Sequence, residues 1–202
     1  MVTTTKAANN QPLTRLLAAA TEDASTAMYR WTAGQVTLSL EEARELPWER
    51  VCEYFGLGEE RRTMVVLRLE GPWSADLILV LDDLNGRQLA ASLLGEEVPP
   101  GRPWNDLERS ALTETGNILG CAYLNAMTRL LGTELVPTPP QFIEDFGASV
   151  LEQAVVQHAL QSERVFVCQT WFVLHGAALD ARLFLLPSQA LRQRIMAALS
   201  SR

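Results

Sequence analysis

The most restrictive feature of the sequence is that its predicted elements occur twice in the same order. In each half a long helix precedes extended segments, a pair of strands and a short closing helix. Ala27-Met28 and Ala126-Met127 lie 99 positions apart, and the apolar string 78–81 matches the string 183–186 at an offset of 105. Each match is weak alone, but the common order favours a duplicated α/β unit.

The duplication predicts a single domain of the α+β class, made of repeats at about 12–97 and 104–202. Residues 1–11 are small and polar, which is typical of a mobile tail. Two repeats would most simply share one largely antiparallel sheet with pseudo-two-fold symmetry, covered by two long helices. The Gly- and Pro-rich stretch 95–103 is the expected linker between them.

Hydrophobic periodicity and turn residues predict the individual elements. Strands are expected at 36–40, 64–69, 75–81, 164–174 and 179–186. Helices are expected at 13–33, 87–94, 105–131, 140–160 and 189–199. The acidic stretch 40–56 is expected to be a loop with a helical turn near 47–54.

Composition excludes several classes of function. The net charge is −7 and the sequence has no cluster of Lys and Arg, which argues against nucleic acids and anionic membranes as partners. The cysteines at 52, 121 and 168 form no CxxC pair, and the two histidines have no metal-ligand spacing. The first twelve residues lack the apolar run of a signal peptide, and no run is long enough to span a membrane. We therefore expect a cytoplasmic protein with reduced thiols and no metal site.

One helix has both a core stripe and an unusual polar face. In the segment 107–140, Ser110, Glu114 and Asn117 are spaced i, i+4 and i+7, so their side chains lie within about 60° of one another. The opposite face carries the apolar stripe Leu112, Leu119, Tyr123, Ala126 and Leu130. An ordinary solvated face is the commonest explanation of such a row. However, glycine and asparagine at 116 and 117 are poor helix formers, which suggests another use for this face.

The same segment resembles the second signature of the chemotaxis phosphatases typified by CheC, with their relatives CheX and FliY. That signature is Asp or Ser, three residues, Glu, two residues, Asn, twenty-two residues and Pro. It is met here by Ser110, Glu114, Asn117 and Pro140 with every gap of the same length. Gly116, Ile118, Gly120, Tyr123 and the Pro-Pro pair at 139–140 also look alike.

The resemblance implies hydrolysis of the aspartyl phosphate on a CheY-type response regulator. Asn117 would orient the attacking water, because a carboxamide both donates and accepts hydrogen bonds. Glu114 would pair with the regulator's active-site lysine, and Ser110, Cys121 and Leu124 would belong to the docking face. Pro140 is expected to open the next helix at its first position. Mg²⁺ and the phosphoryl group would come with the regulator, so no cofactor is expected on this chain.

Many CheC-type proteins carry a second Glu and Asn pair on the first long helix. The offset of 99 places the equivalent positions at Arg15 and Ala18, which can supply neither a carboxylate nor an amide. We therefore expect one site, in the second half. The alternative is a non-catalytic adaptor that binds a phosphorylated receiver or a CheD-type deamidase. A flagellar-switch relative is a weaker alternative, and both monomers and homodimers occur in the family.

Overall fold

The computed structural model describes residues 11–159 and 164–201. The expected tail lies outside the described residues, except for Gln11, where the first helix begins.

Six strands form one sheet in which every neighbouring pair is antiparallel. They are β1 (Val36–Pro47), β2 (Arg61–Leu69), β3 (Ala75–Leu81), β4 (Gln141–Phe146), β5 (Arg164–Leu174) and β6 (Ala177–Pro187), in the order β1-β5-β6-β3-β2-β4. If β1, β2 and β3 change places with β4, β5 and β6, respectively, the order becomes β4-β2-β3-β6-β5-β1. This is the original order counted from the other edge of the sheet. The strings matched at an offset of 105 lie in the central strands β3 and β6, where Ile78 pairs with Phe184 and Leu79 with Leu183.

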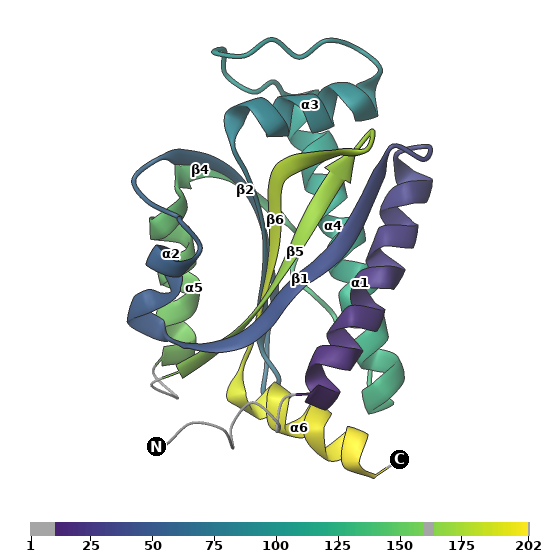
Figure 1. Cartoon of the computed structure of the whole chain (residues 1–202), viewed down its shortest axis with the longest axis vertical. Coiled ribbons are helices and arrows are strands. Elements are labelled where there is room, and N and C mark those ends of the chain that lie inside the picture. The colour runs from purple at the N-terminus through teal and green to yellow at the C-terminus, as the bar shows by residue number, and fades with distance from the viewer. Residues whose placement is uncertain (1–10, 160–163, 202) are drawn as a thin grey trace.

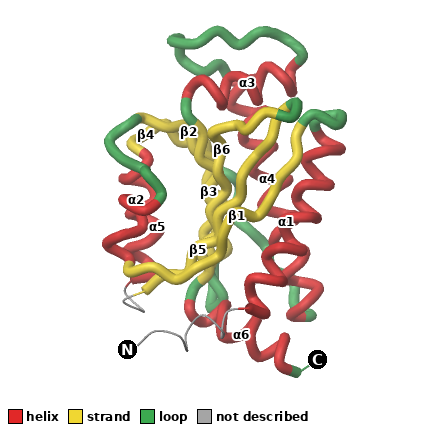
Figure 2. Tube along the Cα trace, viewed as in Figure 1, coloured by secondary structure: helices red, strands yellow, loops and turns green. Residues whose placement is uncertain are grey.

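Helices cover both faces of the sheet (Figures 1 and 2). The long helices α1 (Gln11–Trp31) and α4 (Asp106–Leu131) lie on one face, with α3 (Asp83–Leu94) and α6 (Gln189–Ser200) towards its two ends. The 3₁₀ turn η2 (Trp48–Arg50), α2 (Val51–Tyr54) and α5 (Gly147–Ala159) lie on the other side. The expected α+β fold, with an antiparallel sheet and two long helices on a face, is confirmed.

The alternation of side chains along β2 divides the interior into two cores. Val65 and Leu67 belong to the core under α1 and α4, whereas Met64 and Val66 face α2 and α5. All seven residues of β3 are buried, because this central strand has helices over both of its faces. Its sequence therefore reads as a nearly continuous apolar run.

Helix α4 has well-defined signals at both ends. The Asn105 side chain accepts a hydrogen bond from the Glu108 backbone N–H, and the Glu108 carboxylate accepts one from the Asn105 N–H, which completes a capping box. Gly132 ends the helix in the left-handed conformation, with φ of 64°. Glu108 is buried, 1% exposed, and accepts two hydrogen bonds from Arg102. These contacts fix the start of the helix to the preceding linker.

Two glycines bring α4 against the sheet. A Cβ on Gly116 would lie 2.5 Å from Val65 Cγ1, and one on Gly120 would lie 2.7 Å from Leu67 Cδ2. Real Cβ atoms do not approach so closely, so a larger residue at either site would force the helix or the β2 side chain to shift. Gly116 is therefore explained by packing on β2, and our interpretation of it as a sign of a functional face is wrong.

A chain of buried hydroxyl groups joins α1, α4 and β5. The Tyr123 hydroxyl lies 2.6 Å from the Thr21 hydroxyl and 2.7 Å from the Thr170 hydroxyl. Thr21 also donates to the Leu17 carbonyl oxygen. Because each buried hydroxyl has a partner, the chain links the two long helices to the sheet without leaving an unpaired group.

Two predicted elements are wrong. Residues 41–46 are not a loop but the continuation of β1, which passes a register shift between Leu40 and Glu42 and stays paired with β5 up to Pro47. The predicted helix at 140–160 begins only at Gly147, because residues 141–146 pair with the edge of β2 as β4. Phe142 and Ile143 then pack into opposite cores. Pro140 consequently precedes a strand and does not open a helix.

The first prediction concerns the close approach of α4 to β2. Gly116→Ala should lower the free energy of unfolding by about 1–3 kcal/mol, because the clash with Val65 outweighs the gain of about 1 kcal/mol in helix propensity. Urea unfolding followed by circular dichroism measures the change. Asn125→Ala, at an exposed position of the same helix, is the control and should not destabilise the protein. An unchanged or raised midpoint for Gly116→Ala would contradict the packing.

The second prediction concerns the start of α4. The hydrogen bonds from Arg102 hold the pKa of Glu108 below its ordinary value of 4.5, and the Asn105 N–H acts in the same direction. The folded state therefore gains stability from ionised Glu108 above pH 4.5, and loses it as the pH falls below that value. Glu108→Gln should lower the urea midpoint at pH 7 and flatten its decline between pH 5 and about pH 3. An identical pH dependence in the two proteins would show that Glu108 contributes nothing.

Candidate functional site

Ser110, Glu114 and Asn117 form one row on the outer side of α4. Ser110 and Glu114 are exposed and Asn117 is partly exposed. The glycines of α4 turn the opposite side of the helix into the sheet, and α1 packs beside it. The prediction that the three side chains share an open helix face is confirmed, whereas their role in catalysis stays a prediction.

The Asn117 side chain is held by its neighbour one helical turn later. The thiol of Cys121 donates a hydrogen bond to Asn117 Oδ1, with the sulfur 3.7 Å from the oxygen. Burial raises the pKa of Cys121, and the nearby Glu114 carboxylate raises it further, so the group is a neutral thiol at neutral pH. The contact leaves the Nδ2 donors of Asn117 without a partner among the described residues.

Glu114 differs from three acidic residues on or near α4, each of which has an arginine partner. Glu108 is bound to Arg102, Glu144 to Arg109, and Asp23 to Arg129. Glu114 has neither an ion pair nor a hydrogen bond within the part of the chain that the structure describes. An exposed carboxylate without a partner is available to a cation from another molecule, and Asn117 lies one turn away on the same row.

Leu124, predicted for the docking face, and Pro140, the last residue of the signature, lie away from the row. Leu124 was expected on the docking face, but only 2% of it is exposed, because at this point of the helix its side chain turns into the core under α4. It therefore offers no surface to a partner. Pro140 lies in the connection before β4, far along the chain from the row. Ser110 and Cys121 remain accessible beside Glu114 and Asn117.

The first long helix offers no equivalent row. Arg15 is exposed and Ala18 is partly exposed on α1. An arginine there would repel a lysine of a partner, and alanine has no polar group to hold a water molecule. The offset of 99 pairs Ser110 with Gln11, whose side chain lies outside the described part of the structure.

Among residues 11–159 and 164–201, no three His, Cys, Asp or Glu side chains are grouped as a metal site would require. Within the same residues, no helix has both the length and the apolar character that crossing a membrane would need.

Known proteins resemble this chain over most of its length, although no protein-family model matches it. The CheY-P phosphatase CheC of Bacillus subtilis is 24% identical over 184 residues, which cover 88% of this chain and 87% of that protein. A CheC protein of Halobacterium salinarum is 25% identical over 173 residues, covering 83% of this chain and 86% of the other.

Solved structures share the fold at low sequence identity. FliY of Thermotoga maritima superposes with a TM-score of 0.71 at 17% identity, covering 100% of this chain and 99% of that one. FliM in its complex with FliG from H. pylori gives a TM-score of 0.68 at 14% identity, covering 96% and 100%. CheX from Borrelia burgdorferi, solved with CheY, BeF₃ and Mg²⁺, gives 0.54 at 16% identity, covering 88% and 97%. Distant relatives and fold agree: the chain is similar in sequence to CheC proteins, and it shares its fold with the solved structures of FliY, FliM and CheX.

Proposed function

We propose that this protein stimulates hydrolysis of the aspartyl phosphate on a CheY-type response regulator, using Glu114 and Asn117. The observation that carries the proposal is the open row on α4, in which an unpaired carboxylate lies one turn from a carboxamide with free donors. The distant relative named CheY-P phosphatase and the CheX complex with CheY support the choice of substrate. A cytoplasmic location is part of the proposal.

The reaction requires mainly that the protein position a few groups around the phosphoryl group. Phosphoryl transfer proceeds through a loose transition state, so an in-line water and charge stabilisation matter more than a strong base. Asn117 would hold that water through Nδ2–H and the remaining lone pair of Oδ1. The metal ion and the phosphoryl group belong to the regulator and enter as parts of the substrate.

Glu114 would act in binding. Its free carboxylate can pair with a lysine of the regulator, and this pairing would set the position of Asn117 beside the phosphoryl group. Ser110 and Cys121 would border the contact, with Cys121 also restraining the Asn117 amide. Because the row stands on a helix fixed to the sheet by two glycines, its geometry should be preorganised.

A non-catalytic adaptor is the second candidate. The α1 surface has Arg15 and Ala18 where the Glu and Asn pair would be, and the FliM fold neighbour was solved bound to another protein, FliG. An adaptor would bind a phosphorylated receiver, or a CheD-type deamidase, without shortening the lifetime of the phosphoryl group.

The third prediction tests the amide. Asn117→Ala should reduce the stimulated dephosphorylation of a CheY-type regulator by about 10²–10³-fold, the cost of losing a key positioning hydrogen bond. The decay of the phosphorylated regulator under saturating protein measures this rate. Asn125→Ala removes the same side chain elsewhere on α4 and should keep the full rate. If Asn117→Ala is as active as its control, the proposed role of Asn117 is wrong.

The fourth prediction separates binding from chemistry. Glu114→Gln should raise the concentration of regulator that gives half-maximal rate by about tenfold, because a charge pair with the partner is lost. The maximal rate should change less than it does in Asn117→Ala. The effect should shrink at 1 M salt, where the Debye length is about 3 Å. An equal loss of affinity in Asp145→Asn, a carboxylate on β4, would mean that general charge and not Glu114 matters.

A further inference from the structure

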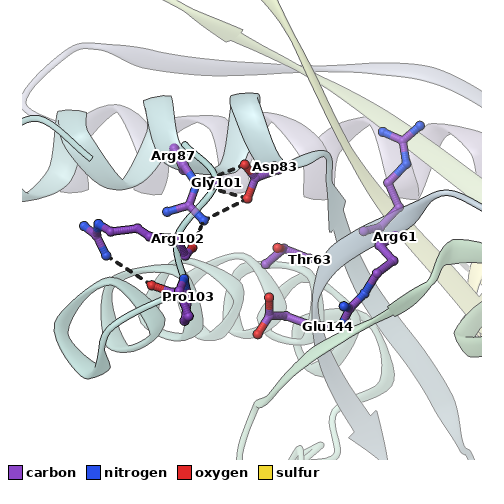
Figure 3. A pocket seen from close by; sticks show the side chains of 9 residues that line it. Arg61, Thr63, Asp83, Arg87, Gly101, Arg102, Pro103 and Glu144 are labelled. Atoms are coloured by element: carbon purple, nitrogen blue, oxygen red, sulfur yellow. Dashed lines mark hydrogen bonds and ion pairs between the residues drawn. The ribbon is translucent and has the colours of Figure 1, made fainter. Parts of the chain in front are cut away.

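A pocket of about 520 Å³ lies outside the α4 row, at the end of the sheet where β2 begins. It is enclosed by β2 and β4, the first turns of α3 and the segment 101–103 before α4 (Figure 3). Four lining residues are arginines, Arg61, Arg62, Arg87 and Arg102, and two are carboxylates, Asp83 and Glu144. This concentration of arginine is unusual in a chain of net charge −7.

Two of the arginines are neutralised from outside the pocket. Arg62 pairs with Glu60 at 2.9 Å, with Asp180 at 3.2 Å and with Asp82 at 4.0 Å, and Arg102 pairs with Glu108. None of these four carboxylates lines the pocket. The carboxylates therefore satisfy the two arginines without adding negative charge to its wall.

The two carboxylates that do line the pocket are themselves paired. Asp83 receives two hydrogen bonds of 3.0 Å from Arg87 Nε, and Glu144 is 3.3 Å from Arg109 Nη2. The charge left on the wall is that of Arg61. Arg61 is exposed and makes no hydrogen bond or ion pair within residues 11–159 and 164–201.

A hydroxyl donor lies on the same side of the sheet as Arg61. Thr63 is two residues further along β2, so its side chain points to the same face, and it is directly opposite Glu144 in the register with β4. Thr63 is only 3% exposed, and its hydroxyl has no hydrogen-bond partner among the described residues. The hydroxyl oxygen is not one of the fully buried unpaired atoms, so it reaches the pocket that Thr63 lines and can donate to water or to a ligand there.

Arg87 supplies a second incomplete donor at the opposite wall. Its guanidinium lies 4.3 Å from the ring of Trp104, and the residue is 3% exposed. Its Nη1 atom is buried and has no hydrogen-bond partner. Figure 3 shows the Arg87–Asp83 pair across the pocket from Thr63 and Glu144. The pocket thus has one unpaired positive charge and donors on two walls that lack acceptors.

We propose that this pocket binds the phosphate group of a small organic phosphate. A tetrahedral anion with several acceptor oxygens fits an arginine fork with a nearby hydroxyl, because each oxygen can accept more than one charge-assisted hydrogen bond. The volume is within the range of small-molecule sites and leaves room for an organic group beside the phosphate. The pocket contains no residue of the Ser110–Asn117 row, so the proposal stands independently of the proposed function.

The fifth prediction uses adenosine 5′-monophosphate and inorganic phosphate as probes. In ¹H–¹⁵N correlation spectra of the full chain, both should shift the amide signals of Arg61, Thr63 and Gly101 in a saturable way, and adenosine should not. In calorimetric titrations, Arg61→Ala should weaken the nucleotide affinity by about tenfold or more, and Thr63→Val by a smaller factor. Arg50→Ala, an exposed arginine outside the pocket, should bind as the wild type does.

Three results would overturn the proposal. These are the absence of saturable shifts with either phosphate probe, equal affinities for Arg61→Ala and Arg50→Ala, and binding of citrate as strong as that of the phosphates. Because Arg61 is an exposed residue at the start of β2, its replacement should leave the thermal midpoint unchanged, which is the check that the variant is folded. If Arg61→Ala unfolds, Arg61→Gln and Thr63→Val carry the same test.

Discussion

The contact that the rest of the structure depends on is the approach of α4 to β2 at Gly116 and Gly120. With no side chain at these positions, the helix packs directly on Val65 and Leu67. This contact fixes which side of α4 faces the sheet, and hence which side carries Ser110, Glu114 and Asn117. The capping box at Asn105 and Glu108 fixes where the helix begins. Packing at the back of the helix therefore sets the position of the candidate site at its front.

The sheet is symmetric, but the candidate site occurs on only one of the two long helices. The strand order is the same when the first three strands are exchanged with the last three, and the two long helices lie on one face. The helices nevertheless differ in chemistry: α4 has a carboxylate and a carboxamide on its open row, while α1 has Arg15 and Ala18. A fold that offers two equivalent surfaces has the proposed chemistry on one, which leaves the α1 surface free for a different contact.

Much of the fold could be predicted because its signals are local. The hairpins have turn residues between apolar runs, and α4 has both a core stripe and caps. The failures have non-local causes. Residues 141–146 form a strand only because the edge of β2 is available to pair with them, and Glu42 to Pro47 remain in β1 only because β5 lies beside them. Leu124 and Gly116 were misjudged because spacing alone does not reveal which neighbour each helix position meets. The pocket around Arg61 is formed by four segments that are distant in the sequence, so no motif in the sequence indicates it.

The central claim is that the row on α4 performs catalysis and does not only bind. Its most direct test measures the release of phosphate from a CheY-type regulator that is continuously phosphorylated. This protein is added at about one-twentieth of the concentration of the regulator. Catalysis predicts many turnovers for each protein molecule, a rate proportional to its concentration, and loss of that rate in Asn117→Ala. A regulator that binds the protein but keeps its spontaneous rate of phosphate release would contradict the account.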